Sequence, residues 1–535
     1  MPPALTYPGV YIQEIPSGVR TITGVATSVA AFVGRTARGP VNTPVTITSF
    51  ADYERTFGAL SLNYPVGFSV RDFYDNGGGI ALVVRAFKEK TGSKTAAIDY
   101  DGGKLKLTAV SPGSWAQNLR VRVELAPVPA DLEPLRQQLG LPDVKSFFNI
   151  RIRNTTPGAE QEEAFFNVTA EPSARQLKGI LEAGSSLVRG DATSVPAAHK
   201  AVTTPAEQAT LWSDPLFSAP VDHPNDVLDS DYLTAADDFG KSADGSGMYA
   251  LDHADLFNLL VIPPDDGLNG TVTPDVHKNA ATYCAGKRAL YIVDPPPTWD
   301  TVEKAKNIAE LTITGETARY AALYFPRVRK ANPLHGDLIE TFTASGMIAG
   351  VMARTDTTRG VWKAPAGVDA ALNGVTALAL NPPMNDLQNG ILNQLGENCL
   401  RTFPIIGTVI WGARTLRGAD LLADDYKYVP VRRTANFIEE SLFRGLKWVV
   451  FEPNDEPLWA QIRLNVGAFM QGLFRQGAFQ GTSARDAYFV ACDKTTTTQN
   501  DINLGIVNVV VGFAPLKPAE FVVVKIQQIA GQIQT

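Results

Sequence analysis

The spacing of hydrophobic residues between Phe403 and Ile526 predicts a complete small α+β unit. Short apolar runs predict strands at Thr408–Trp411 and Lys447–Pro453, with a helix between them. A second helix opens behind the capping sequence Asn454–Pro457. Its apolar residues recur at helical period on one face, which is therefore expected to be buried. These residues are Leu458, Ile462, Val466, Phe469 and Leu473.

The same unit ends in apolar strands that need a partner. Runs at Gly505–Phe513 and Phe521–Ile526 predict a sheet whose apolar edge would promote aggregation unless it is covered. Near the N-terminus, Pro8 and Pro16 bracket an extended segment that has no local strand to pair with. We therefore expect the arm of one subunit to add to the sheet of another, by β-augmentation. The residues expected to exchange are Val10, Tyr11, Ile12, Glu14, Phe521, Val522, Val523, Val524 and Ile526.

The rest of the chain shows two further patterns. Between residues 255 and 379, short apolar strands alternate with helices, which predicts a parallel sheet covered on both faces. Between residues 88 and 189, the alternation of strands predicts an inserted β-rich domain. The fold class is therefore multidomain α/β and α+β. The expected parts are an extended arm at 1–20, an α/β domain formed by 21–87 with 245–380, the inserted domain at 88–189, a linker or loop-rich extension at 190–244, and a C-terminal domain at 381–535.

Composition excludes several classes of function. A chain of 535 residues is long enough for several domains, because single hydrophobic cores stop growing well below this size. A net charge of −7 with interspersed signs argues against a nucleic-acid binder. The three cysteines lie far apart in apolar sequence, so we expect buried thiols rather than a disulfide or zinc site. We also expect no signal peptide and no direct membrane insertion, since no leader pattern or long apolar run is present.

Candidate chemistry is weak throughout the sequence. The best hydrolase candidate combines Ser345 as nucleophile, His335 as base and Asp294 as the orienting carboxylate. His335 is too close to Ser345 in the sequence for the subtilisin order, so Ser345 is better interpreted as a helix N-cap. The five histidines show no ligand spacing, and no catalytic residue, metal or cofactor is expected. The acidic pairs interpreted as solvated surface are Asp237–Asp238, Asp265–Asp266 and Asp424–Asp425.

Several ordered runs point to one protein family. In the C-terminal stretch they are Trp411–Leu416, Val431–Arg433, Phe437–Ser441, Val449–Asn454 and Pro515–Phe521. Tyr7–Tyr11 and Ser28–Gly39 extend the pattern to the N-terminal end. Together they resemble contractile tail sheath proteins, which polymerise around the rigid tube of bacteriophage tails and phage-like contractile injection systems.

The resemblance implies a structural, force-generating subunit. Stacked, hexameric rings of the protein would form a helical sheath around an inner tube protein and contract to drive that tube through a target envelope. The other implied partners are baseplate and tail-terminator proteins. The implied location is the host bacterial cytoplasm during assembly, and afterwards a virion tail or phage-like particle.

The resemblance also bears on single residues and on the alternatives. It favours Arg463 and Arg475 as tube-facing residues, although a solvated helix face explains them nearly as well. In the family, the region that matches residues 255–379 is called subtilisin-like, and terminal strands are exchanged between C-terminal domains. The subtilisin-like label keeps a hydrolase as the main alternative function. A monomeric, adhesin-like surface protein that uses residues 88–189 is a third.

Overall fold

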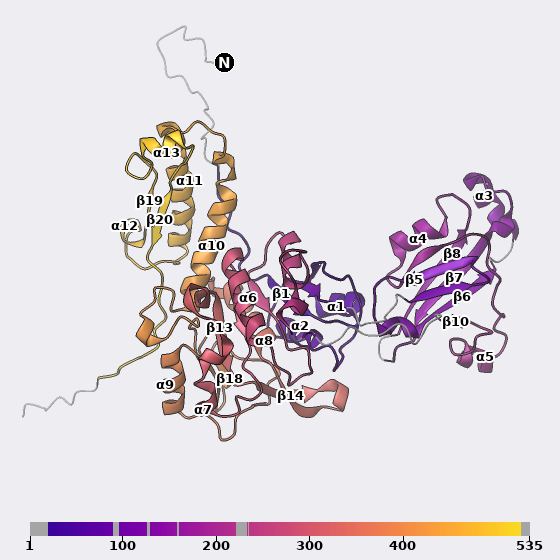
Figure 1. Cartoon of the computed structure of the whole chain (residues 1–535), viewed down its shortest axis with the longest axis horizontal. Coiled ribbons are helices and arrows are strands. Elements are labelled where there is room, and N and C mark those ends of the chain that lie inside the picture. The colour runs from indigo at the N-terminus through magenta and orange to yellow at the C-terminus, as the bar shows by residue number, and fades with distance from the viewer. Residues whose placement is uncertain are drawn as a thin grey trace, which may run out of the picture. The chain divides into compact units, whose positions relative to one another are not determined.

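The computed structural model describes residues 20–88, 96–125, 129–157, 160–220, 233 and 235–525. The chain divides into two compact units, and each is built from separated stretches of sequence. The described part of the smaller unit comprises residues 20–27, 355–365 and 424–525, and the larger unit comprises 28–354 and 366–423. Figure 1 labels the elements of both units.

The larger unit is organised around an eight-stranded sheet with the order β18-β17-β13-β12-β11-β1-β3-β2. Neighbouring strands are parallel except at the two ends, where β2 and β18 run antiparallel to β3 and β17. The parallel sheet predicted from the alternation of strands and helices is therefore confirmed. The strands are β1 (Ala30–Gly34), β2 (Val45–Ile47), β3 (Ala81–Arg85), β11 (Leu259–Val261), β12 (Leu290–Val293), β13 (Ala321–Phe325), β17 (Asn398–Phe403) and β18 (Gly407–Ile410).

Helices cover both faces of this sheet, as a parallel sheet requires. They include α1 (Phe50–Phe57), α2 (Val66–Asp75), α6 (Pro274–Lys287), α7 (Val302–Ala305), α8 (Ser345–Arg359) and α9 (Asp386–Leu395). Ala31 shares a core cluster with Ala280 of α6. Phe32 points to the other face, where its ring centroid lies 5.6 Å from that of Phe73 of α2. A Cβ at Gly346 would lie 2.2 Å from a backbone oxygen of α2, so glycine permits the close approach of α8.

The larger unit also contains a small antiparallel sheet. It contains β14 (Val328–Asn332), β15 (Leu338–Phe342) and β16 (Ala377–Leu378), in the order β15-β14-β16. Lys330 of β14 is buried, forms an ion pair with Asp72 of α2 and lies 4.5 Å from the ring centroid of Phe342. The aromatic ring and the carboxylate together stabilise a charge that would otherwise be costly to bury.

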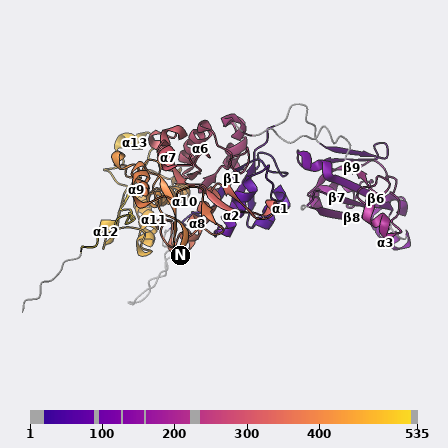
Figure 2. The same cartoon turned by 90° about the horizontal axis from the view of Figure 1, so that it is seen from below.

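Residues 97–220 form two further antiparallel sheets with a core of their own (Figure 1, Figure 2). One sheet has the order β10-β6-β7-β8 and the other β4-β5-β9. The elements are β4 (Ala97–Tyr100), β5 (Leu105–Ala109), β6 (Leu119–Leu125), α3 (Pro129–Leu139), β7 (Phe147–Asn154), β8 (Gln161–Thr169), α4 (Leu177–Gly184), β9 (Val188–Ala192), α5 (Pro205–Thr210) and β10 (Ala219–Pro220). The expected β-rich texture is present, but α5 and β10 come from the stretch expected to be a linker. An independent inserted domain remains a prediction.

The smaller unit contains two long helices and a two-stranded sheet. Its elements are α10 (Val429–Gly445), α11 (Glu456–Arg475), α12 (Ala484–Ala487), β19 (Tyr488–Ala491), α13 (Gln499–Asn503) and β20 (Val510–Phe513). In Figure 1, α10 and α11 lie side by side. The ring centroids of Phe437 in α10 and Phe469 in α11 are 6.1 Å apart. Asp455 caps α11 by accepting a hydrogen bond from the Leu458 amide, as the sequence predicts. The predicted apolar stripe is buried, although Phe469 only partly.

Three strand predictions for the C-terminal stretch need correction. The strand at Thr408–Trp411 is β18, but it pairs with β17 and belongs to the larger unit. The run at Lys447–Pro453 is a short 3-10 helix and a turn, with Phe451 fully exposed at a φ of 71°. Only Val510–Phe513 of the run from residue 505 is a strand. Short apolar runs look alike in sequence whether or not a neighbouring strand is available to pair with them.

Two buried acids were also not recognised from sequence. Asp265 was expected on the surface, but it is buried and forms an ion pair with Arg35 at 2.7 Å. Glu397 directly precedes β17 and is 0% exposed. Within the described residues neither of its carboxylate oxygens has a hydrogen-bond partner. Burial without a compensating charge raises the pKa of Glu397 from 4.5 to about 9.

Replacement of Glu397 by Gln should stabilise the protein increasingly as the pH rises from 5 to 8. Below pH 4.5 the carboxyl is protonated in both the folded and the unfolded state. Between 4.5 and about 9 the folded state must hold a proton that the unfolded state has released, so folding is progressively disfavoured. We expect a gain of roughly 2–3 kcal/mol at pH 7, measured by chemical unfolding at several pH values.

The control is Glu316→Gln, because the Glu316 side chain is 83% exposed. It should leave the free energy of unfolding nearly constant across the same pH range. A destabilised Glu397→Gln variant at pH 7 would show that the carboxylate is ionised and bound to a partner.

Candidate functional site

The two-stranded sheet of the smaller unit is the first part of the candidate site. β19 and β20 are antiparallel, with Tyr488 opposite Phe513 and Ala491 opposite Val510. Within the part of the chain that the structure describes, no third strand joins this sheet. A two-stranded sheet is marginal by itself, and here the contact between α11 and β19 supports it. The outer edges therefore offer backbone groups to an added strand.

The second part is the apolar segment that follows this sheet. The side chains of Phe521, Val522, Val523 and Val524 are 75–83% exposed. Phe521–Lys525 forms no strand in the single chain, which corrects the prediction of a strand within the same subunit. The neighbouring Glu520 is held by the Tyr428 hydroxyl at 3.2 Å. A run of consecutive exposed apolar side chains marks an interaction site, because water solvates it poorly.

The remaining residues predicted for strand exchange lie outside the described residues. They are Val10, Tyr11, Ile12, Glu14 and Ile526. The described chain begins at Arg20, whose amide donates to the Asn465 side chain of α11 at 3.1 Å. Ile22 then enters the core of the smaller unit. The segment that follows the predicted arm is therefore anchored next to α11.

The two arginines predicted to face the tube have different surroundings on α11. Arg463 donates to Glu456 at 2.6 Å and to the backbone oxygen of Cys492, and Gln471 accepts a hydrogen bond from Tyr488 of β19. Arg463 and Gln471 therefore lie on the side that contacts the sheet and its flanking loop. Arg475 is exposed. The outer stripe that leads to it consists of Gln461, Leu464 and Ala468.

A buried ion pair holds the separate stretches of this unit together. Arg433 of α10 binds Asp356 through two hydrogen bonds of 2.6 and 2.9 Å, and both side chains are 3% exposed. The same guanidinium donates to the backbone oxygen of Thr27 at 2.9 Å. Burial raises the pKa of Asp356, and Arg433 opposes that shift. The sequence analysis did not assign this role, although the arginine pair in an otherwise apolar helix start was a usable signal.

The hydrolase candidates do not form a triad. The Ser345 hydroxyl donates to Asp294, and the same carboxylate accepts from the amides of Ala344 and Ser345 at 3.0 Å. His335 is bound instead to Glu340 at 2.7 Å, close to the surface. Asp294 therefore caps the start of α8, and Ser345 is not itself the cap, contrary to the prediction. Burial raises the pKa of Asp294 despite these hydrogen bonds.

The buried thiols expected from the sequence are present. The cysteines at 284, 399 and 492 are free and buried. Among the described residues, no cluster of His, Cys, Asp or Glu could hold a metal ion. None of the described helices combines the length and apolarity needed to cross a bilayer. The two-stranded sheet and the exposed apolar segment of the smaller unit are thus the strongest candidate site.

Comparison with known proteins identifies the family that this site resembles. The family model of the phage tail sheath C-terminal domain matches residues 423–529, which include α10, α11 and both strands of the small sheet. The resemblance to contractile tail sheath proteins is confirmed. The tail sheath protein of Burkholderia phage BcepMu is 24% identical over 496 residues, covering 89% of this chain and 88% of that protein. The tail sheath protein of Vibrio phage KVP40 is 28% identical over 152 residues, only 21% of its own length.

A solved structure extends the likeness to the fold of the whole chain. The sheath complex of an extracellular contractile injection system, PVC, in its contracted state has a TM-score of 0.57 at 22% identity. The match covers 98% of both chains. The mixed α/β multidomain fold is therefore that of known sheath subunits.

Replacing Asp356 by Ala should destabilise the smaller unit by about 3–5 kcal/mol, because Arg433 would be left buried without its carboxylate. The change can be measured by chemical unfolding followed by circular dichroism. The exposed pair between Glu456 and Arg463 provides the control, and Glu456→Ala should cost less than about 1 kcal/mol.

A double variant, Asp356→Leu with Arg433→Met, tests whether the loss comes from the uncompensated charge of Arg433. It should be more stable than Asp356→Ala, because no uncompensated charge remains buried. Equal losses in the single and double variants would contradict this role of the ion pair.

Proposed function

We propose that the protein is the structural subunit of a contractile sheath, which polymerises as stacked rings around an inner tube and contracts to drive the tube through a target cell envelope. The observation that carries this proposal is the match of residues 423–529 to the sheath C-terminal domain, in the same unit that exposes unpaired strand edges and an apolar tail. Exposed edges of this kind are avoided in monomeric proteins, because they invite association. In a polymer subunit they are the means of assembly.

The proposed link between subunits is strand exchange. Phe521–Val524 and Ile526 of one subunit, and the arm that contains Val10, Tyr11, Ile12 and Glu14 of another, would add to the sheet formed by β19 and β20 of a third. Main-chain hydrogen bonds would supply the affinity, and alternate side chains the register. The anchor at Arg20 supports this arrangement, because the arm would start from a fixed point beside α11. Such a mesh could persist while the larger units repack during contraction.

The other parts of the proposal concern the fold, the partners and the location. The parallel sheet with helices on both faces agrees with a subtilisin-like domain, in which Asp294 and Ser345 serve structure rather than catalysis. The sheath would consist of hexameric rings and contact the tube, the baseplate and a tail terminator, without nucleic acid. It would assemble in the host cytoplasm and remain in a virion tail or phage-like particle. The alternative hydrolase would need a base close to Ser345, and His335 is bound to Glu340.

The purified wild-type protein should form hollow tubes in negative-stain electron microscopy. Deletion of residues 2–16 should abolish ordered tubes and leave the circular dichroism nearly unchanged, because the arm serves intersubunit pairing. Val523→Pro should have almost the same effect, since proline removes a hydrogen-bond donor from a strand that must pair.

Phe521→Ala is the matched control, because it trims an exposed side chain but keeps every backbone donor. It should weaken assembly less than Val523→Pro. Normal tubes from the deletion variant would disprove the proposed link, and a wild-type protein that forms no tubes would disprove the sheath function.

Replacement of both Arg463 and Arg475 by Glu should weaken assembly on the cognate tube, with a stronger effect at low salt, where charges are least screened. We expect Arg475→Glu to account for most of the loss, because Arg463 is already paired with Glu456. Co-sedimentation with purified tubes measures the effect. Lys494→Glu, which changes the charge of an exposed residue by the same amount as Arg475→Glu alone, should bind tubes normally. Equal binding by the double variant would assign both arginines to solvated surface.

A further inference from the structure

A groove of about 710 Å³ lies against the four-stranded sheet of residues 97–220. Charged side chains from three neighbouring strands line one side, and residues 198–212 line the other. The volume is within the range of about 300–1,000 Å³ that small-molecule sites occupy. The proposed sheath role uses none of these residues, so the groove calls for a separate explanation.

The sheet side of the groove carries an alternating network of arginines and glutamates. Arg122 lies opposite Arg151 in the register of β6 and β7, an arrangement of like charges that is unfavourable by itself. Glu124 lies 2.7 Å from Arg122 and 3.5 Å from Arg151, and Glu162 lies 3.3 Å from Arg151. The charges are therefore largely compensated inside the network. Unused N–H groups and carboxylate lone pairs can still bind a ligand.

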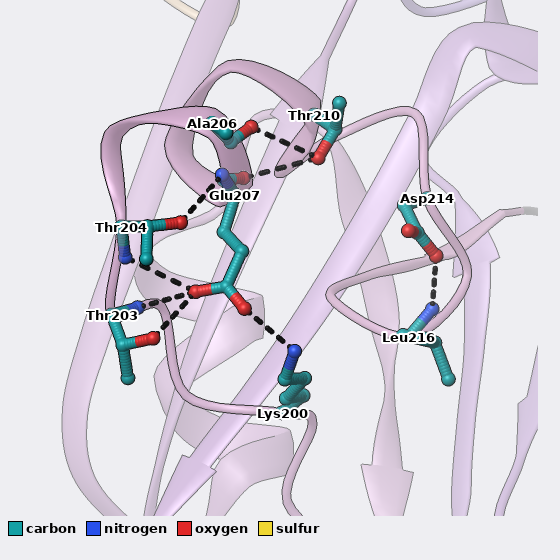
Figure 3. A network of polar contacts seen from close by, with 8 residues as sticks. All are labelled: Lys200, Thr203, Thr204, Ala206, Glu207, Thr210, Asp214 and Leu216. Carbon is teal, nitrogen blue, oxygen red and sulfur yellow. Dashed lines mark hydrogen bonds and ion pairs between the residues drawn. The ribbon is translucent and has the colours of Figure 1, made fainter.

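The opposite side is held in shape by the first turn of α5 (Figure 3). The Glu207 carboxylate accepts hydrogen bonds from the amides of Thr203 and Thr204 and from Lys200, while the Thr204 hydroxyl accepts from the Glu207 amide. The hydrogen bonds from Lys200 and from the hydroxyl and amide of Thr203 lower the pKa of Glu207 to about 2. Glu207 therefore stays ionised over the physiological pH range, and Gln208 of the same helix is exposed and lines the groove.

An aromatic ring and a buried imidazole complete the lining. Trp212 is half-buried, with the Arg153 guanidinium 5.8 Å from its ring centroid. His199 is 9% exposed and stacks on Tyr100 at 4.5 Å. Its Nδ1 accepts from the Val123 amide, so Nε2 carries the proton, and among the described residues Nε2 has no acceptor. The groove thus combines an apolar platform with hydrogen-bonding groups of both kinds.

From this lining we propose that the groove binds a short, uncharged oligosaccharide. The apolar face of a sugar ring packs on Trp212, and its neighbouring hydroxyls bind the paired arginine and glutamate side chains and Gln208. A hydroxyl both donates and accepts, which matches a network in which donors and acceptors alternate.

The charge balance argues against the other ligand classes. An anionic polymer would meet Glu124 and Glu162 in the groove, and all three arginines there already lie within 3.9 Å of one of these carboxylates. An apolar ligand would cover the ion pairs without replacing their hydration, which is unfavourable. The ligand that satisfies both the tryptophan ring and the polar floor is therefore neutral and rich in hydroxyls.

The test is isothermal titration calorimetry of the intact protein with maltotriose, cellotriose and triacetylchitotriose. We expect saturable binding of at least one, and about a tenfold or greater loss of affinity in both Trp212→Ala and Gln208→Ala. Gln208 is exposed on a helix, so Gln208→Ala retains the fold even if Trp212→Ala does not. Affinity should change less than about twofold between pH 5.5 and 8, because burial and Arg122 lower the pKa of His199 to about 4.

Leu216→Ala is the control, because Leu216 is 64% exposed on the same segment and does not line the groove. It should bind the sugar as wild type does. The proposal is overturned if none of the three sugars binds, or if Trp212→Ala and Gln208→Ala bind normally. It is also overturned if dextran sulfate binds in place of the sugars and loses affinity in these variants. Each outcome is independent of tube formation and leaves the proposed sheath function untouched.

Discussion

The smaller unit depends on the buried contact between Arg433, Asp356 and the backbone of Thr27. These residues come from three stretches that are far apart in the chain, and no continuous helix or strand links all three. Two hydrogen bonds to the carboxylate and one to a carbonyl fix the geometry, so the charges are fully partnered where water is excluded. The start of α10 is thereby placed beside the segment that leads to the predicted arm. The candidate assembly surfaces are built on this arrangement.

The two units differ in how the edges of their sheets are covered. In the larger unit, parallel strands are covered by helices, and short antiparallel strands close both ends of the sheet. In the smaller unit, β19 and β20 remain a pair, and the apolar residues from Phe521 to Val524 stay exposed. Backbone groups and apolar side chains that one subunit leaves open are available to the next. In the proposed sheath subunit, this difference would separate the stable body from the part that links subunits.

Several acidic residues that the sequence suggests as catalytic or surface groups stabilise the fold instead. Asp294 caps α8, and Asp265 neutralises Arg35 in the interior. Glu397 is the exception, because its carboxyl is buried without a partner among the described residues and costs stability at neutral pH. The groove next to Trp212 shows the opposite, because its residues were not candidates in the sequence. Its residues are unremarkable along the chain and become a candidate site only when three strands place them on one face.

The sequence by itself determined the local elements and the broad class of the protein. Helical periodicity located the buried face of α11, the capping sequence Asn454–Pro457 located its start, and alternating apolar runs indicated the parallel sheet. Only the tertiary structure decided which strands pair, because apolarity shows that a run can be buried but not what lies beside it. It therefore placed β18 in the larger sheet, left Phe451 in solvent and buried Glu397. Contacts over long sequence separations, such as Arg433 with Asp356, leave no local pattern from which they could be predicted.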